Sequence, residues 1–98
     1  MAEHLIIRPE AEADLTDAFN WYEKQLEGLG SDFLNSVEAA LFAIKRNPDC
    51  SPFIHRQIRR QLIRRFPYGI FYTQNGSTIV VIAVFHARRN PGSWRKRL

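Results

Sequence analysis

The segment from Thr78 to Phe85 carries apolar residues at almost every position. Branched and aromatic residues favour an extended strand, whose side chains point alternately to its two faces. A strand that is apolar on both faces must be buried on both. The chain therefore requires a sheet with this strand inside it. Helices can cover one face, and the C-terminal tail or a partner must cover the other.

Two amphipathic helices are predicted before this strand. Pro9 ends a short strand candidate over His4 to Arg8 and suits the first position of a helix. Gly28-Leu29-Gly30 breaks the pattern, Gly30 or Ser31 can cap a second helix, and Asn47-Pro48 ends it. Apolar residues recur at helical spacing in both segments: Ala11, Leu15, Ala18, Phe19, Tyr22 and Leu26, then Phe33, Leu34, Val37, Leu41 and Ile44. Such a pair, joined by a short break, predicts an antiparallel helical hairpin.

The second half of the chain predicts strands. Residues 48–56 indicate a loop, and strands are expected over 58–65, 68–74 and 78–85. Asn75-Gly76 is a two-residue hairpin signal. The 98 residues therefore predict one α+β domain, 1–98, of order β-α-α-β-β-β, with the helical hairpin packed on one face of a small antiparallel sheet.

Cysteine content and hydropathy bear on the cellular compartment. Cys50 is the single cysteine, so no intrachain disulfide and no metal cluster is expected. The N-terminus lacks the layout of a signal peptide, and the longest apolar run is too short to span a membrane. We expect a cytoplasmic protein without a cofactor and without membrane contact.

Charge is divided between the two halves of the chain. All ten acidic residues lie before position 50, and the last of them is Asp49. Ten of the fourteen basic residues follow it. Such asymmetry favours a surface that meets a negatively charged partner, although a solvated basic edge is the alternative.

The basic residues suggest where that partner binds. The pairs Arg59-Arg60 and Arg64-Arg65 fall within one predicted strand, so one member of each pair could line a common groove. Arginine offers a planar fork for phosphate or carboxylate. The alternative is an edge strand protected by charge against aggregation. The candidate target-binding or phosphate-binding residues are Arg59, Arg60, Arg64, Arg88, Arg89, Arg95, Lys96 and Arg97.

Few residues suggest catalysis. His86 ends the central strand and could act as a base near neutral pH, or serve as a hydrogen-bonded structural residue. The basic half has no carboxylates for two-metal chemistry, so any RNA cleavage would be metal-independent. Trp94 either stacks on a base or folds back onto the sheet. If Trp94 packs on the sheet, truncation at Gly92 is expected to cost about 3 kcal/mol of stability.

Several segments, in order, resemble the RelE/ParE-type toxins, which include proteins called plasmid stabilisation toxins. They are the opening 8–15, Trp21-Tyr22-Glu23, the break at 28–33, Asn47-Pro48, the middle strands 58–72 and the ending from Val84 to Trp94. The resemblance covers nearly the whole chain and implies the same β-α-α-β-β-β fold. It also implies the toxin of a type II toxin–antitoxin pair, neutralised by a cognate antitoxin, with operator DNA contacted only through that antitoxin. Removal of the basic tail is expected to abolish toxicity without unfolding the domain.

The family has two kinds of target. RelE-like members cut messenger RNA on the ribosome, and Arg65 and His86 match the catalytic positions of some of them. Those members usually carry a tyrosine after the histidine, where this chain has Ala87, and others use a lysine cluster that residues 50–90 lack. The resemblance therefore favours the ParE-like branch, which poisons DNA gyrase. A plain nucleic-acid-binding module is a third hypothesis, since the basic half could track phosphates.

Overall fold

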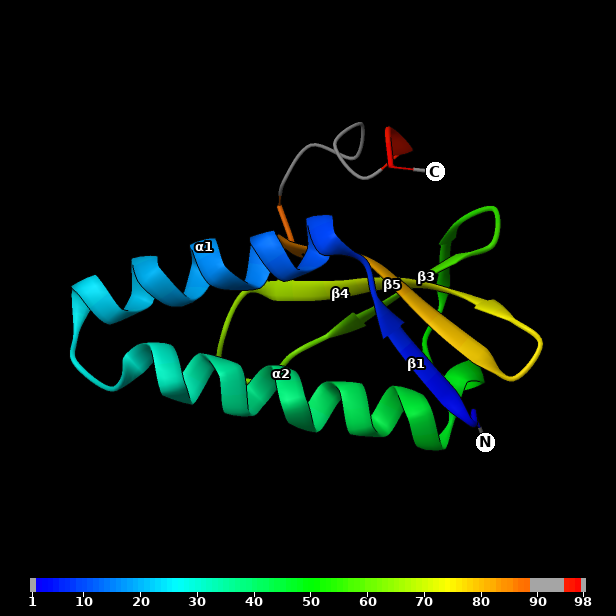
Figure 1. The fold of residues 1–98 in the computed structure, drawn as a ribbon, viewed down its shortest axis with the longest axis horizontal. Helices are drawn as coiled ribbons and strands as arrows, with labels where there is room; N and C mark the ends of the chain where they lie inside the picture. Colours follow the sequence, from blue (N-terminus) through cyan, green and yellow to red (C-terminus); the bar gives the residue numbers. More distant parts are fainter. Residues whose placement is uncertain (1, 89–94, 98) are drawn as a thin grey trace.

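The computed structural model describes residues 2–88 and 95–97. Its sheet has five strands in the order β1-β5-β4-β3-β2 (Figure 1). Strand β5 (Thr78–His86) is an interior strand and lies between β1 (His4–Ile7) and β4 (Tyr68–Asn75). Strands β3 (Ile58–Leu62) and β2 (Phe53–His55) follow on the far side. The β1–β5 pair is parallel and the other pairs are antiparallel, so the predicted α+β fold is confirmed with one parallel edge.

Helices α1 (Pro9–Gln25) and α2 (Leu29–Arg46) form the predicted hairpin on one face of this sheet (Figure 1). A side chain of α1 organises the turn between them. The Glu23 carboxylate accepts hydrogen bonds from the N–H groups of Gly28, at 3.0 Å, and Gly30, at 2.9 Å. Helix α2 therefore begins at Leu29, earlier than the predicted cap at Gly30 or Ser31, because Glu23 replaces a local cap.

Gly30 lies where the two helices touch. A Cβ atom added there would come within 2.8 Å of the Phe19 backbone carbonyl oxygen and of its ring. We expect Gly30→Ala to lower the free energy of unfolding by about 2 kcal/mol, since the backbone of α1 must move. Chemical denaturation would measure the loss. The neighbouring exposed Ser31→Ala is the control, and equal stability of both variants would contradict this close-contact role.

A β-bulge in β5 distributes its apolar residues between two cores. Phe71 pairs with Ala83 but Tyr72 pairs with Val81, so Ile82 is an extra residue in β5. The bulge reverses the alternation expected from the sequence, and places Ile82 and Ala83 on the same side. The core under the helices contains Ile79, Val81 and Val84, and the core on the second face contains Ile82, Ala83 and Phe85.

The second face is covered by other parts of the same chain. Ile58 of β3 is buried in that core, and Ile54 of β2 packs against it. Near the C-terminus, the guanidinium carbon of Arg97 lies 4.5 Å from the centroid of the Phe85 ring. The C-terminal tail, one of the two candidates named from the sequence, therefore provides at least part of the cover of the second face. Trp94, the residue predicted to do it, lies outside the described residues.

Three local predictions need correction. The segment 48–56 is not a plain loop, because it holds a 3-10 turn, η1 (Pro48–Cys50), and then β2. The strand predicted over 58–65 ends at Leu62, since the chain turns through a left-handed Arg65 before Pro67. The β4–β5 hairpin is confirmed, but its turn is Gly76-Ser77, closed by the pair Asn75 and Thr78.

Candidate functional site

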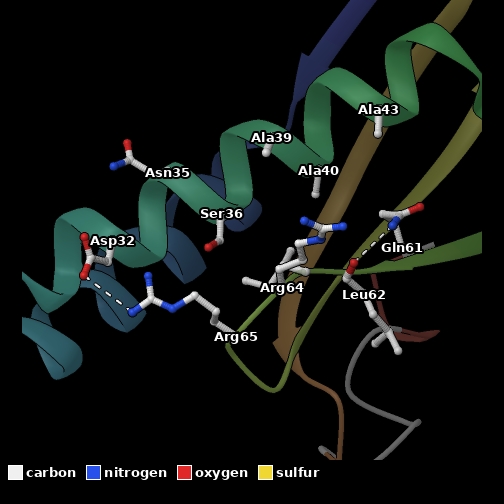
Figure 2. Close-up of a pocket in the computed structure, with 11 residues that line it drawn as sticks. Asp32, Asn35, Ser36, Ala39, Ala40, Ala43, Gln61, Leu62, Arg64 and Arg65 are labelled. Carbon is white, nitrogen blue, oxygen red and sulfur yellow. Dashed lines mark hydrogen bonds and ion pairs between the residues drawn. The ribbon is translucent and has the colours of Figure 1, made fainter.

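A groove of about 650 Å³ separates helix α2 from the β3 side of the sheet. Its hollow comes from small side chains on one face of α2, which Figure 2 shows directed toward the opposite wall. These residues are Ser36, Ala39, Ala40 and Ala43, at the three- and four-residue spacing that keeps them on one helix face. The opposite wall is the segment 61–65. The groove can therefore accept a segment of another chain.

The edge of β3 beside this groove is open. Strand β2 pairs only with Ile58 and Arg59. The Arg60 N–H points outward to the Pro52 carbonyl at 3.2 Å, whereas the Ile63 N–H points inward to the Tyr68 carbonyl at 3.1 Å. By alternation the Leu62 N–H also points outward, beyond the end of β2. Such an edge is a template for another strand or for polar groups of a partner.

Arg65 lies at the Asp32 end of the groove, and the Arg64 side chain extends into its middle, toward Ala40 (Figure 2). The expectation that the two arginines occupy alternating strand positions is wrong, because both follow β3 in a turn. Arg65 adopts a φ of 70° and lies 3.7 Å from the Asp32 carboxylate, with both side chains largely exposed. An exposed pair of this kind contributes little stability and can exchange for an anionic partner.

Arg59 and Arg60 occupy β3 as predicted, but their surroundings differ. Arg59 donates to the carbonyl of Ser51 at 2.5 Å, pairs with Asp49 at 3.5 Å and lies 3.7 Å from the Phe53 ring centroid. Its guanidinium therefore anchors the segment that leads into β2. The stem of Arg60 lies over Gly69, where an added Cβ would be 2.9 Å from the Arg60 Cγ.

His86 lines a separate cleft of about 260 Å³ against α1. Its ring makes an edge contact with Tyr68 at 5.6 Å, and its Nδ1 accepts a hydrogen bond from the Arg88 N–H at 3.1 Å. Asp14, Asp17 and Trp21 complete the cleft. Arg65 lines the α2–β3 groove instead, so the structure places the two candidate catalytic residues in different cavities.

Arg97 does not project freely into solvent. It forms a two-pronged ion pair with the Asp14 carboxylate at 2.6 and 3.1 Å, and also donates to the Ile82 carbonyl at 3.2 Å. Asp14 in turn accepts a hydrogen bond from the Val84 N–H at 3.0 Å. The pair thus satisfies backbone groups at the β5 bulge, beyond the end of β1. Although Asp14 lies on a helix whose other acids are exposed or half-exposed, its own side chain is only 10% exposed.

The other basic candidates of the ending are differently placed. Arg88, Arg95 and Lys96 are exposed, and Arg89 lies outside the described residues. Arg95 lies close enough to His55 of β2 to act on its charge. Burial lowers the pKa of His55, and the positive charges of Arg95 and Arg56 lower it further.

Two residues of importance had no clear signal in the sequence. Arg56 occupies the β2–β3 turn with a φ of 48°, where asparagine or glycine is the usual indication of a turn. Asp14 resembles the other acids of α1 in sequence. Its burial follows from the position of the bulge, which no local pattern encodes.

Within the described part of the chain, no group of three or more histidine, cysteine or carboxylate side chains is arranged to hold a metal ion. The same residues contain no helix long and apolar enough to cross a bilayer. What the described surface offers is therefore a groove, an open strand edge and clustered basic residues.

Comparison with known proteins agrees with this architecture. Residues 5–91 match the family model described as the ParE toxin of the type II toxin–antitoxin system parDE. A chain from the solved structure of the chromosomal ParDE TA system from P. aeruginosa has the same fold, with a TM-score of 0.64 at 17% identity over 85% of this chain and 94% of that one. A search of curated proteins finds no match. Since the family model covers most of the sequence, the chain belongs to the ParE toxin family of type II toxin–antitoxin systems.

Proposed function

We propose that this toxin acts in the cytoplasm by binding and inhibiting DNA gyrase, and that a cognate antitoxin neutralises it. The observation that carries the choice of target is the separation of Arg65 and His86 into two cavities. Cleavage of RNA needs charge stabilisation and proton transfer at one phosphate. Inhibition by binding needs no such convergence.

The groove beside α2 is the proposed antitoxin site. An antitoxin segment has there an open strand edge at Leu62, a hollow over Ala39 and Ala43, and the basic side chains of Arg64 and Arg65. An acidic segment that orders on binding suits these three features together. From the sequence, a partner was one of two candidates to cover the second face of the doubly apolar strand. Ile54, Ile58 and Arg97 of the same chain contribute to that cover, so the second face gives no argument for an antitoxin there.

The two targets can be separated with purified components. We expect the toxin to inhibit supercoiling by gyrase and to leave messenger RNA intact on programmed ribosomes. His86→Ala and Arg65→Ala should both retain the inhibition, because neither residue performs chemistry under this proposal.

An endoribonuclease would behave in the opposite way. Loss of the arginine would slow cleavage roughly 10²–10³-fold and loss of the histidine roughly 10²–10⁴-fold. Ribosome-dependent cleavage that disappears in His86→Ala would therefore overturn the gyrase proposal and support the alternative.

A further inference from the structure

One side of helix α2 carries apolar side chains that the rest of the described chain leaves largely uncovered. Phe42 is 64% exposed, although it is a large aromatic residue. It lines a shallow groove of about 500 Å³ together with Leu41 and with Leu5 of strand β1. The Ala2 N–H donates to the Lys45 carbonyl at 2.9 Å, so the chain that leads into β1 lies against the end of α2 (Figure 1). Exposed apolar side chains that gather in this way mark an interaction surface.

Two charges of opposite sign flank these apolar residues. Glu38 and Lys45 both line the groove, and they lie two helical turns apart on the same side of α2. Both are exposed, and neither takes part in an ion pair of the described residues. The midpoint between them falls between Leu41 and Phe42, about 5 Å along the helix axis from each charge. We name Leu5, Glu38, Leu41, Phe42 and Lys45 the α2–β1 face.

The order of charges on the α2–β1 face is complementary to itself. When two α2 helices pack antiparallel with Leu41 and Phe42 at the point of contact, Glu38 of each copy lies opposite Lys45 of the other. A two-fold axis therefore gives two ion pairs around one apolar centre, and both copies use the same face. An acidic segment of another protein would match only one of the two charges. The charge pattern thus favours a second copy of this chain as the occupant.

The sheet edge on the same side of the molecule is open. Strand β1 is the last strand of the described sheet and pairs only with β5. The N–H groups of His4 and Arg8 donate toward the β5 side. By alternation the N–H groups of Leu5 and Ile7 point away from the sheet. An open edge of this kind invites another chain, and a second copy beside the α2–β1 face would shield it.

We propose that the toxin forms a homodimer through the α2–β1 face, with helix α2 of one copy antiparallel to helix α2 of the other. Phe42 of each copy fills the shallow groove of its partner, which removes two large apolar side chains from water. The two pairs of Glu38 with Lys45 fix the register of the helices, because a contact centred elsewhere would separate the charges. This association concerns the toxin alone and holds whichever target the toxin has.

Sedimentation velocity of the purified toxin over a series of concentrations tests the proposal. We expect an equilibrium between monomer and dimer. Phe42→Asp should raise the dissociation constant of the dimer roughly 100-fold, because it places a charge at the apolar centre of the interface. Since Phe42 is exposed, the variant should remain folded, and circular dichroism would verify this.

Charge reversal identifies the groups that meet across the two-fold axis. Glu38→Lys and Lys45→Glu should each weaken the homodimer roughly tenfold, because each places like charges opposite one another at both ends of the contact. An equimolar mixture of these two variants should recover the affinity of the unchanged toxin, since opposite charges then meet at both ends. Lys24→Glu is the control, because it reverses an exposed charge on α1 outside the α2–β1 face.

Three results would overturn the proposal. The first is a toxin that stays monomeric at every concentration. The second is a dimer that Phe42→Asp leaves intact, or a mixture of the two charge variants that associates no better than either alone. The third is a monomeric toxin whose Phe42→Asp variant loses affinity for the cognate antitoxin, which would assign the α2–β1 face to the antitoxin.

Discussion

Replacing Asp14 with alanine should lower the free energy of unfolding by about 3 kcal/mol, because removal of one partner leaves the other buried groups uncompensated. The Asp14 carboxylate is the acceptor for both the Arg97 guanidinium and the Val84 N–H. Without it, the Val84 amide at the bulge loses its partner and Arg97 keeps only backbone acceptors. In a domain of this size, that loss is a large part of the total stability.

Urea denaturation of Asp14→Ala, Arg97→Ala and the double variant would measure the coupling between the two side chains. We expect a coupling free energy on the order of 2 kcal/mol. Asp17→Ala is the matched control, since Asp17 is an exposed acid on the same helix without an ion pair in the described part of the chain. A coupling near zero would show that the two side chains stabilise the bulge independently, if at all.

The ion pair between Asp14 and Arg97 changes what we expect when the C-terminal tail is removed. From the sequence, removal of the basic tail was expected to leave the domain folded. The contacts of Arg97 with Asp14, the Ile82 carbonyl and Phe85 imply that this removal costs stability. Charge at Arg95 and Lys96 can be removed without that cost, since both side chains are exposed.

Filling the groove should release the toxin from its antitoxin. We expect Ala39→Gln/Ala43→Gln to weaken antitoxin binding at least 100-fold, since two long side chains would occupy the hollow that we propose for the antitoxin segment. Both positions are exposed and glutamine is a good helix former, so folding should be retained. Titration calorimetry with the cognate antitoxin would measure the affinity.

Glu38→Gln is the control for this experiment. It introduces the same side chain on the same helix, at a position outside the groove. In cells, the groove variant should remain toxic when the antitoxin is co-expressed, while the control should be neutralised. An affinity within twofold of the unchanged toxin would place the antitoxin elsewhere on the surface.

Local patterns predicted the parts of the fold that have a strong local cause. Pro9 begins α1, as a residue with a fixed φ and no N–H is expected to do, and the apolar stripes define both helices. The doubly apolar β5 lies inside the sheet, as burial on both faces required. The parallel pairing of β1 with β5 was not predicted, because it depends on how the helical hairpin returns the chain to the sheet.

The candidate site was harder to predict, since its features arise from tertiary contacts. The sequence suggested a groove lined by arginines, and Arg64 and Arg65 do line one, but its other wall on helix α2 was not predicted. In the sequence, nothing distinguishes Arg97 from Arg95, because both lie in the same basic segment. A backbone carbonyl at the bulge and a carboxylate on α1 distinguish the two, and neither is visible in local composition.

The ion pair between Asp14 and Arg97 also bears on how the toxin first forms in the cell. It joins residues 83 positions apart, and the neighbouring β1–β5 pair joins residues 74 positions apart. During synthesis the ribosome makes the helices and β1 long before it makes β5 and Arg97. Contacts this far apart in sequence close late and slowly. The nascent chain therefore cannot complete its sheet until β5 and Arg97 have been synthesised. An antitoxin already present in the cell could bind the toxin during this time.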